Sequence, residues 1–273
     1  MSIRRALSPL AKRTIKAVLP LAGARRLQQF FGDLHGLPSP QGVPGDISIA
    51  VETTIAAEFL PAGNAVIVDV GANHGAWTTA MLARGGGRIG QIIAVEPQSA
   101  LMPTLEAIAH QDARVQIINT AMGRSAGSAV LYSDKVGSGL ASLTKRKLDH
   151  VAIDMSLQEH VEVVSLDCLA QSMGFDHIDV LKLDIEGHEL DALSGAGRLL
   201  SEKRIGYIQF EFGGCNIDTR TYLRDFWHFF NDRNYSIGLI SLRGQTPILI
   251  PLTQYKEALE NFTTTNYGAW PRP

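Results

Sequence analysis

Residues 65–75 indicate the fold most directly, and they read Ala65-Val-Ile-Val-Asp-Val-Gly-Ala-Asn-His-Gly75. The first six form a short, nearly continuous apolar run, which is typical of a strand buried on both faces of a sheet. The glycines that follow allow a tight turn, and a helical pattern then runs from Ala76 to Arg84. A buried strand that enters a helix through such a turn presents the helix N-terminus to a ligand.

The same alternation of strands and helices continues along the chain. Strands are expected at 91–95, 115–119, 178–183 and 206–212, and helices at 47–60, 99–110, 165–173, 188–200 and 219–232. This order implies right-handed crossovers and a parallel sheet. Two closing strands, near 235–240 and 248–250, have no full helix between them. We therefore predict an α/β fold with a doubly wound, mostly parallel, seven-stranded sheet and an antiparallel edge strand.

The composition excludes several classes of protein. With 273 residues, 45% of them hydrophobic, and a net charge of −2, the chain can bury a full core and is too apolar for a disordered protein. The near-neutral charge argues against a generally basic nucleic-acid binder, so no nucleic-acid partner is expected. The two cysteines, Cys168 and Cys215, are too few for a disulfide framework, which fits a reducing, cytoplasmic location. No stretch approaches the roughly 20 apolar residues of a spanning helix.

The first 45 residues differ from the rest of the chain. Seven arginines and lysines precede the first acid, Asp33, and residues 36–45 hold three prolines and three glycines, as a linker does. We therefore expect a basic helical arm with a linker at 1–45 and one domain at 46–273. Three interpretations of the arm stay open: packing on the domain, peripheral contact with the inner face of the membrane, and a targeting segment.

An acid downstream of the glycine turn predicts a nucleoside cofactor. Glu96 ends the second strand, where a carboxylate can accept both ribose hydroxyls. The turn lacks the middle glycine of a dinucleotide fingerprint, and Asp69 would repel a pyrophosphate. That carboxylate suits the sulfonium of S-adenosylmethionine, although it could instead cap the turn. The candidate cofactor residues are Asp69, Gly71, Asn73, Gly75, Glu96, Asn119 and Ala121.

Ionisable residues gather where the later strands end. Asp184 follows the strand at 178–183, at the edge where open α/β sheets bind ligands, and Glu211 takes the matching place on the next strand. We expect this pair to face one crevice and to serve as base or as metal ligands. Lys182 and His188 are further catalytic candidates, with structural roles as the alternatives. No third acid stands plainly beside the pair, so a divalent metal is possible but a metal-free site is favoured.

Four motifs, in order, resemble those of the FkbM-type methyltransferases: Val68-Asp-Val-Gly-Ala-Asn-His-Gly75, Ala94-Val-Glu-Pro97, Val164-Ser-Leu-Asp167 and Leu181-Lys-Leu-Asp-Ile-Glu-Gly-His-Glu189. The resemblance spans about residues 50–250 and implies a class I, Rossmann-like, S-adenosylmethionine-dependent fold. It also implies methyl transfer to a hydroxyl, often of a sugar or a polyketide-type metabolite. The N-terminal 45 residues fall outside it.

Two other functions compete with the O-methyltransferase of a sugar, glycan or secondary metabolite. One is an NAD(P)-dependent oxidoreductase on the same fold, against which the turn sequence counts. The other is a non-catalytic scaffold that keeps a cofactor pocket, against which the carboxylates at the strand ends count. The stretch 137–142 is typical of a mobile loop, and the segment 134–147 around it would shape the acceptor pocket without a readable code.

Overall fold

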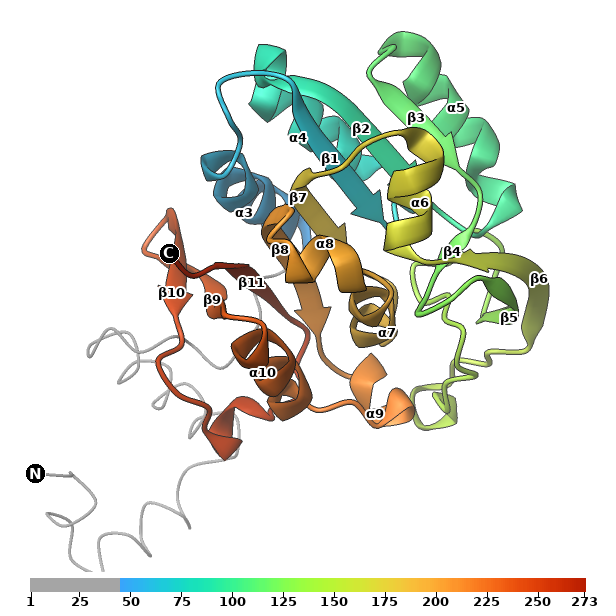
Figure 1. Ribbon diagram of the computed structural model, residues 1–273. Helices are drawn as coiled ribbons and strands as arrows, with labels where there is room; N and C mark the ends of the chain where they lie inside the picture. Colours follow the sequence, from blue (N-terminus) through green and yellow to red (C-terminus); the bar gives the residue numbers. More distant parts are fainter. Residues whose placement is uncertain (1–44) are drawn as a thin grey trace, which may run out of the picture. The chain divides into compact units, whose positions relative to one another are not determined.

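The computed structural model describes residues 45–273 (Figure 1). The expected basic arm lies outside this range, so the boundary predicted at residue 45 stays a prediction. The first described element is helix α3, Gly45–Glu58, which begins two residues before the helix expected from Ile47. Within residues 45–273, no helix is long and apolar enough to cross a membrane.

An eight-stranded sheet organises the described residues, in the order β10-β9-β11-β8-β7-β1-β2-β3. Its parallel half consists of β3 (Val115–Ile118), β2 (Ile89–Val95), β1 (Ala65–Val70), β7 (Ile178–Leu183) and β8 (Ile205–Phe212). Its other half consists of β11 (Thr265–Pro271), β9 (Tyr235–Arg243) and β10 (Thr246–Pro251), paired antiparallel. The predicted α/β fold is confirmed, with one strand more than the seven expected.

The additional strand is β11, which lies between β8 and β9 and runs antiparallel to both. Antiparallel pairing therefore occurs inside the sheet as well as at its edge, where β10 pairs with β9. The sequence of β11, TNYGAWP, has neither an apolar run nor a regular alternation. Its place comes from tertiary contacts, since Tyr267 and Ala269 are fully buried against neighbouring strands.

Alternate residues of β1 face two helical layers (Figure 1). Val66, Val68 and Val70 pack in a core that includes residues of α6 (Leu166–Met173), α7 (Glu189–Ser194), α8 (Gly197–Ser201) and α10 (Leu223–Asp232). Ile67, on the other face, packs with residues of α3 and α4 (Ala76–Gly85). Helix α5 (Met102–Gln111) lies beside β3. Helices on both faces leave the carboxyl ends of the parallel strands open to a ligand.

Two helices differ from the prediction. The helix expected at 188–200 is divided into α7 and α8, separated near Gly195, where a Cβ would lie 2.3 Å from the Gly123 carbonyl oxygen. The helix expected at 219–232 begins only at Leu223, as α10, and the short α9 (Cys215–Thr219) precedes it. The described 3-10 turns are η2 (Gly86–Arg88), η3 (Ser99–Leu101), η4 (Asp149–Val151) and η5 (Glu257–Leu259).

A small second sheet accounts for the irregular middle of the sequence. Strands β4 (Ala121–Met122), β5 (Gly127–Ser133) and β6 (Leu157–Val164) form it in the order β4-β6-β5. The connection from β5 towards η4 begins with residues 134–147, which we call the strap. The strap contains three buried residues, Ser138, Ser142 and Arg146, so it is tied down more firmly than a mobile loop would be.

Candidate active site

The turn between β1 and α4 requires glycine at two places for different reasons. Gly71 has φ +75°, and a Cβ there would lie 1.9 Å from the Asp184 carbonyl oxygen. Gly75 has φ +76°, and a Cβ there would lie 2.3 Å from Ile108 Cδ1 of α5. Gly71 therefore brings the backbone close to β7 at the mouth of a pocket, whereas Gly75 lets the turn pack on α5.

Asp69 and Lys182 form a buried ion pair between β1 and β7. Asp69 Oδ1 lies 3.1 Å from Lys182 Nζ, and Asp69 Oδ2 accepts the Thr78 hydroxyl at 2.6 Å. Lys182 also donates to the Gly71 carbonyl at 3.1 Å. Burial lowers the pKa of Lys182, but the charges of Asp69 and Asp184 outweigh it, so the pKa is raised and the ammonium persists.

This pairing corrects two assignments made from sequence. Asp69 is fully buried against Lys182 and Thr78, so its carboxylate does not face a cationic ligand. Lys182 is 4% exposed and is committed to Asp69 and the Gly71 backbone, so it is not placed for catalysis. Neither residue lines the pocket described next. Both therefore fit the structural alternative.

A pocket of about 730 Å³, part of it open to solvent, lies at the carboxyl ends of β1 and β2. Of the predicted cofactor residues, Gly71, Asn73, Glu96 and Ala121 line it, and Asp69, Gly75 and Asn119 do not. The Asn119 amide instead donates to the carbonyls of Glu96 and Pro97, at 2.9 and 3.0 Å. The other residues that line the pocket include Val95, Gln98, Thr120, Met122, Leu131, Asp184 and His188.

Glu96 is held in a fixed orientation in this pocket. Its Oε2 accepts the Asn73 N–H at 2.9 Å, and its Oε1 accepts the backbone and side-chain N–H groups of Gln98 at 3.0 and 3.1 Å. Burial raises the pKa of Glu96, although these hydrogen bonds lower it. A carboxylate has about four acceptor positions, so capacity is left for a ligand hydroxyl.

The pocket fits a nucleoside by three independent features. Apolar residues such as Val95 and Leu131 share its wall with polar ones, as is typical of small-molecule sites. The buried Thr120 hydroxyl has no hydrogen-bond partner in the described part of the chain. The absence of a side chain at Gly71 leaves backbone at the pocket wall. Sequence reasoning did not find Gln98 or Thr120, because neither belongs to a recognisable motif.

The strap crosses from this pocket to the ends of β7 and β8. Its Ser138 carbonyl accepts the side-chain amides of Asn73 and Gln98, at 3.3 and 3.0 Å. Further along, the Ser142 hydroxyl donates to the Glu186 carbonyl at 2.9 Å. Thr144 Oγ1 lies 3.0 Å from His188 Nε2. One segment therefore contacts both the predicted cofactor residues and the predicted catalytic residues.

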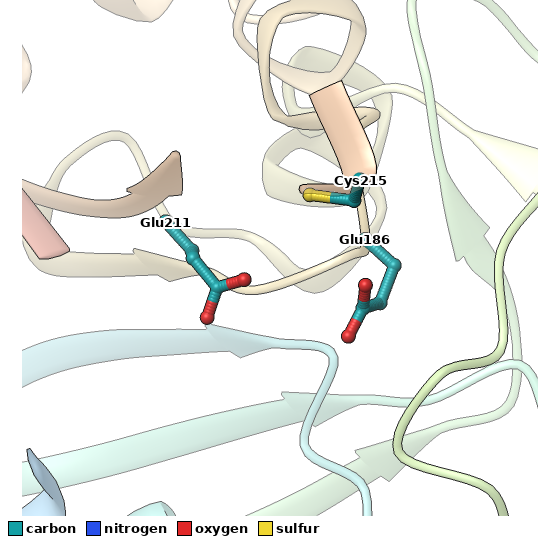
Figure 2. A group of neighbouring side chains, drawn as sticks. All are labelled: Glu186, Glu211 and Cys215. Atoms are coloured by element: carbon teal, nitrogen blue, oxygen red, sulfur yellow. The ribbon is translucent and has the colours of Figure 1, made fainter. Parts of the chain in front are cut away.

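Acidic side chains gather at the strand ends beneath the strap. Single ligand-type atoms of Glu186, Glu211 and Cys215 lie within 4.8 Å of one another, and the three residues come from the turn after β7, from β8 and from α9 (Figure 2). Arg146 of the strap donates to Glu186, and its Nε lies 3.4 Å from Asp218 Oδ2. We call Glu186, Glu211 and Cys215 the acidic cluster.

Both carboxyl groups of the acidic cluster have a raised pKa. Burial raises the pKa of Glu186 to about 8, in spite of the opposing charge of Arg146. Burial also raises the pKa of Glu211 well above its usual range, and the charges of Asp184 and Glu186 raise it further. Among residues 45–273, no side chain or backbone group donates a hydrogen bond to Glu211 that would offset this effect.

The structure brings the predicted pair of Asp184 and Glu211 together, although only Asp184 lines the pocket. Asp184 lines the pocket, with its Oδ2 3.4 Å from Lys182 Nζ, while Glu211 lies with Glu186 and Cys215. The two carboxyl groups interact electrostatically, and Asp184 is the largest charge acting on Glu211, ahead of Glu186. As expected, Phe210 and Phe212 are buried in the core. His188 both precedes α7 and lines the pocket.

Sequence reasoning missed Cys215 and Arg146. Both cysteines are free, and Cys215 reaches the cluster because Gly213 and Gly214 turn the chain directly after β8. The glycine pair after a buried strand was thus the feature of the sequence that could have indicated a turn of Cys215 towards the strand ends. A divalent cation could use two carboxylates and a thiol, but it would have to displace Arg146 from Glu186. The geometry therefore favours the ion pair, and the metal-free site stays a prediction.

Comparison with known proteins gives a consistent result. The family model described as Methyltransferase FkbM domain matches residues 69–237, which is more than half of the chain. A search of curated protein sequences gave no significant match. The α/β fold with a mixed sheet, which the sequence predicted, agrees with this family model.

Three solved structures illustrate the similarity. Methyltransferase FkbM from Methylobacillus flagellatus KT is 18% identical, over 77% of this chain and 44% of that one, with a TM-score of 0.47. An rRNA methylase from Streptococcus thermophilus is 13% identical, over 81% and 95%, with a TM-score of 0.42. A putative O-methyltransferase from Klebsiella pneumoniae is 12% identical, over 100% of both chains, with a TM-score of 0.43. This chain thus spans less than half the length of the first.

Proposed function

This chain belongs to the FkbM family of S-adenosylmethionine-dependent methyltransferases, and we propose that it methylates a hydroxyl of an uncharged acceptor such as a sugar, a glycan or a secondary metabolite. One observation carries the proposal. The pocket around Glu96 adjoins the strand end that carries Asp184, next to the acidic cluster. A cofactor and a proton acceptor would therefore lie side by side.

The pocket residues suggest how the cofactor would be held. Glu96 would accept ribose hydroxyls, the Gly71 backbone would approach the cofactor closely, and Thr120 would find its missing hydrogen-bond partner. When bound, S-adenosylmethionine supplies an electrophilic methyl group on a sulfonium cation. The main task left for the protein is to orient the acceptor oxygen.

The charges at the strand ends support an acceptor without negative charge. The two buried cations at the strand ends are already paired, Lys182 with Asp69 and Arg146 with Glu186 and Asp218. A phosphate or carboxylate on the acceptor would meet Asp184, Glu186 and Glu211 without an unpaired buried cation to balance it. A hydroxyl, in contrast, can donate its proton to a carboxylate, which we assign to Glu211.

The test measures release of S-adenosylhomocysteine from S-adenosylmethionine in the presence of neutral sugars, glycans, sugar phosphates and polyketide-type alcohols. We expect turnover with at least one neutral acceptor and none with its phosphorylated form. Turnover only with amines, or only with phosphorylated acceptors, would reject the hydroxyl assignment. Cofactor binding without turnover on any acceptor would favour the scaffold alternative.

For the location and the partners of the protein, we propose what the sequence led us to expect. The protein acts in the cytoplasm on a small-molecule or glycan acceptor, without a nucleic-acid partner. Of the three interpretations of residues 1–45, peripheral contact with anionic membrane would use the seven cations that precede any acid, while packing on the domain and a targeting segment stay as alternatives. Sedimentation of the full chain with anionic vesicles, reduced at high salt, would support the membrane contact.

A further inference from the structure

The side chain of Arg146 links three segments that are far apart in the sequence. It belongs to the strap, bonds Glu186 in the turn after β7, and lies 3.4 Å from Asp218 of α9. The backbone N–H of the next residue, Lys147, donates to the other Asp218 oxygen at 3.2 Å. The Arg146 side chain is 8% exposed and that of Glu186 is 14% exposed, so solvent screens the pair little.

The backbone at Glu186 is held in a conformation that non-glycine residues rarely adopt. Glu186 has φ +52°, and Gly187 after it has φ +100°. The Ser142 hydroxyl donates to the Glu186 carbonyl, and buried Glu189 accepts the N–H groups of Ile185 and Gly187, both at 3.1 Å. Strained residues that their surroundings fix in this way occur often at functional sites. The result here is that Glu186 points to Arg146.

The charges around Glu186 and Glu211 leave Arg146 as the main compensating cation. Without it, the two carboxyl groups of the acidic cluster would be like charges close together, and such groups share a proton. Lys182 stands near but is paired with Asp69. The titratable and charged groups that face the pair are Glu52 on α3, Lys182 on β7, Asp184 after it, Arg146 on the strap, His188 and Glu189 at α7, and Cys215 and Asp218 on α9.

We propose that Arg146 is a positioning residue for methyl transfer: it pairs with Glu186 and offsets the negative charge of the acidic cluster, which favours the ionised form of Glu211 that takes the hydroxyl proton. This inference rests on the proposed function. As the acceptor oxygen gains the methyl group, its proton passes to a Glu211 oxygen, and Glu211 later returns that proton to water. Because the strap also contacts Asn73 and Gln98, Arg146 is anchored on the same segment that borders the cofactor pocket.

The test uses the charge difference between two cofactor forms and needs no acceptor. The full chain is titrated by calorimetry with S-adenosylmethionine, a cation at sulfur, and with neutral S-adenosylhomocysteine, from pH 6.5 to 9.5. The ratio of the two dissociation constants reports the negative charge near the sulfur. In the wild type, we expect the preference for S-adenosylmethionine over S-adenosylhomocysteine to increase with pH, because the carboxyl groups of the acidic cluster lose their protons and become negatively charged.

The variants separate positioning from a merely structural role. Arg146→Gln should move the midpoint of this increase up by about one pH unit, since an opposite charge at such a distance lowers a carboxyl pKa by about 1–3 units. Arg146→Lys should keep most of the wild-type midpoint, and Glu186→Gln should lower it, because Arg146 then acts on Glu211 alone. Lys145→Gln is the matched control, as it removes an exposed cation from the neighbouring strap position.

Two failures can be told apart. If the wild type binds neither ligand at any pH, the proposed function itself is wrong. If it binds both, but Arg146→Gln and Lys145→Gln have the same midpoint, the role of Arg146 is overturned. Should Arg146→Gln fail to fold, a Glu186→Gln midpoint equal to that of the wild type would overturn it as well. Titration of the ligands' own amino groups is common to all variants and cancels in the comparison.

Discussion

At the scale of single residues, some acids of the site are placed to bind a ligand and others only stabilise the fold. Asp69 is fully buried and serves Lys182 and Thr78, whereas Glu96 is fixed by Asn73 and Gln98 and still faces a pocket. Both acids come from the carboxyl ends of neighbouring strands, β1 and β2. Sequence position alone could not distinguish them. The buried hydrogen-bond partners decide which carboxylate is free for a ligand.

The residue prediction concerns Glu211. Glu211→Gln removes the proposed proton acceptor with little change in shape, so turnover should fall by roughly 10²-fold. The dissociation constant of S-adenosylhomocysteine should stay within about threefold of the wild-type value, well below the tenfold change that about 1.4 kcal/mol represents. The same assays with EDTA should show no loss of wild-type turnover, as the metal-free prediction requires. Near-normal turnover of Glu211→Gln would remove it from the mechanism.

At the scale of elements, the ends of β1, β7 and β8 are joined by buried charges as well as by hydrogen bonds. The sequence predicted β1 and β7 to their exact bounds, because apolar residues occupy both ends and at least four of the six positions of each. It did not predict the strap contacts, since Arg146 meets Asp218 across 72 residues of chain. Nor did it predict β11, which has neither an apolar run nor a regular alternation and is placed by pairing on both sides. Local pattern determines such strands only when burial is continuous along them.

The element prediction tests the ion pair between β1 and β7. Asp69→Asn keeps the shape but leaves the Lys182 charge with only partial compensation from Asp184, 3.4 Å away. Loss of one partner of a buried pair typically costs about 3–5 kcal/mol, and we expect that loss in the free energy of unfolding in urea. The control is Glu202→Gln, which breaks the exposed Arg198–Glu202 pair and should cost about 1 kcal/mol or less. Equal effects would contradict the assignment.

At the scale of the whole molecule, the fold class and the edge of the sheet that carries the site were predictable from the sequence. Alternating strands and helices place Glu96, Asp184 and Glu211 at one edge, and the structure places all three there. What the pattern could not supply was the side-chain pairing within that edge. This pairing depends on contacts between the strap, α9 and the strand ends, each brought in by a different stretch of chain.

The prediction for the whole chain concerns its basic first segment. The pocket residues all lie between Val70 and His188, so deletion of residues 1–40 should leave the S-adenosylhomocysteine dissociation constant within about threefold of the full-chain value. Vesicle sedimentation of the two forms should differ, because the deletion removes all seven cations. A tenfold loss of cofactor affinity would place the first segment at the pocket and move the predicted domain boundary.

The most direct measurement is calorimetric binding of S-adenosylhomocysteine to the wild type and to Glu96→Ala. Loss of a charge-assisted hydrogen-bond acceptor costs roughly 1.5–3 kcal/mol, so the variant should bind about 10- to 100-fold more weakly. NAD⁺ should give no binding heat with either protein. An unchanged affinity for S-adenosylhomocysteine in Glu96→Ala would contradict the account of this pocket as the cofactor site.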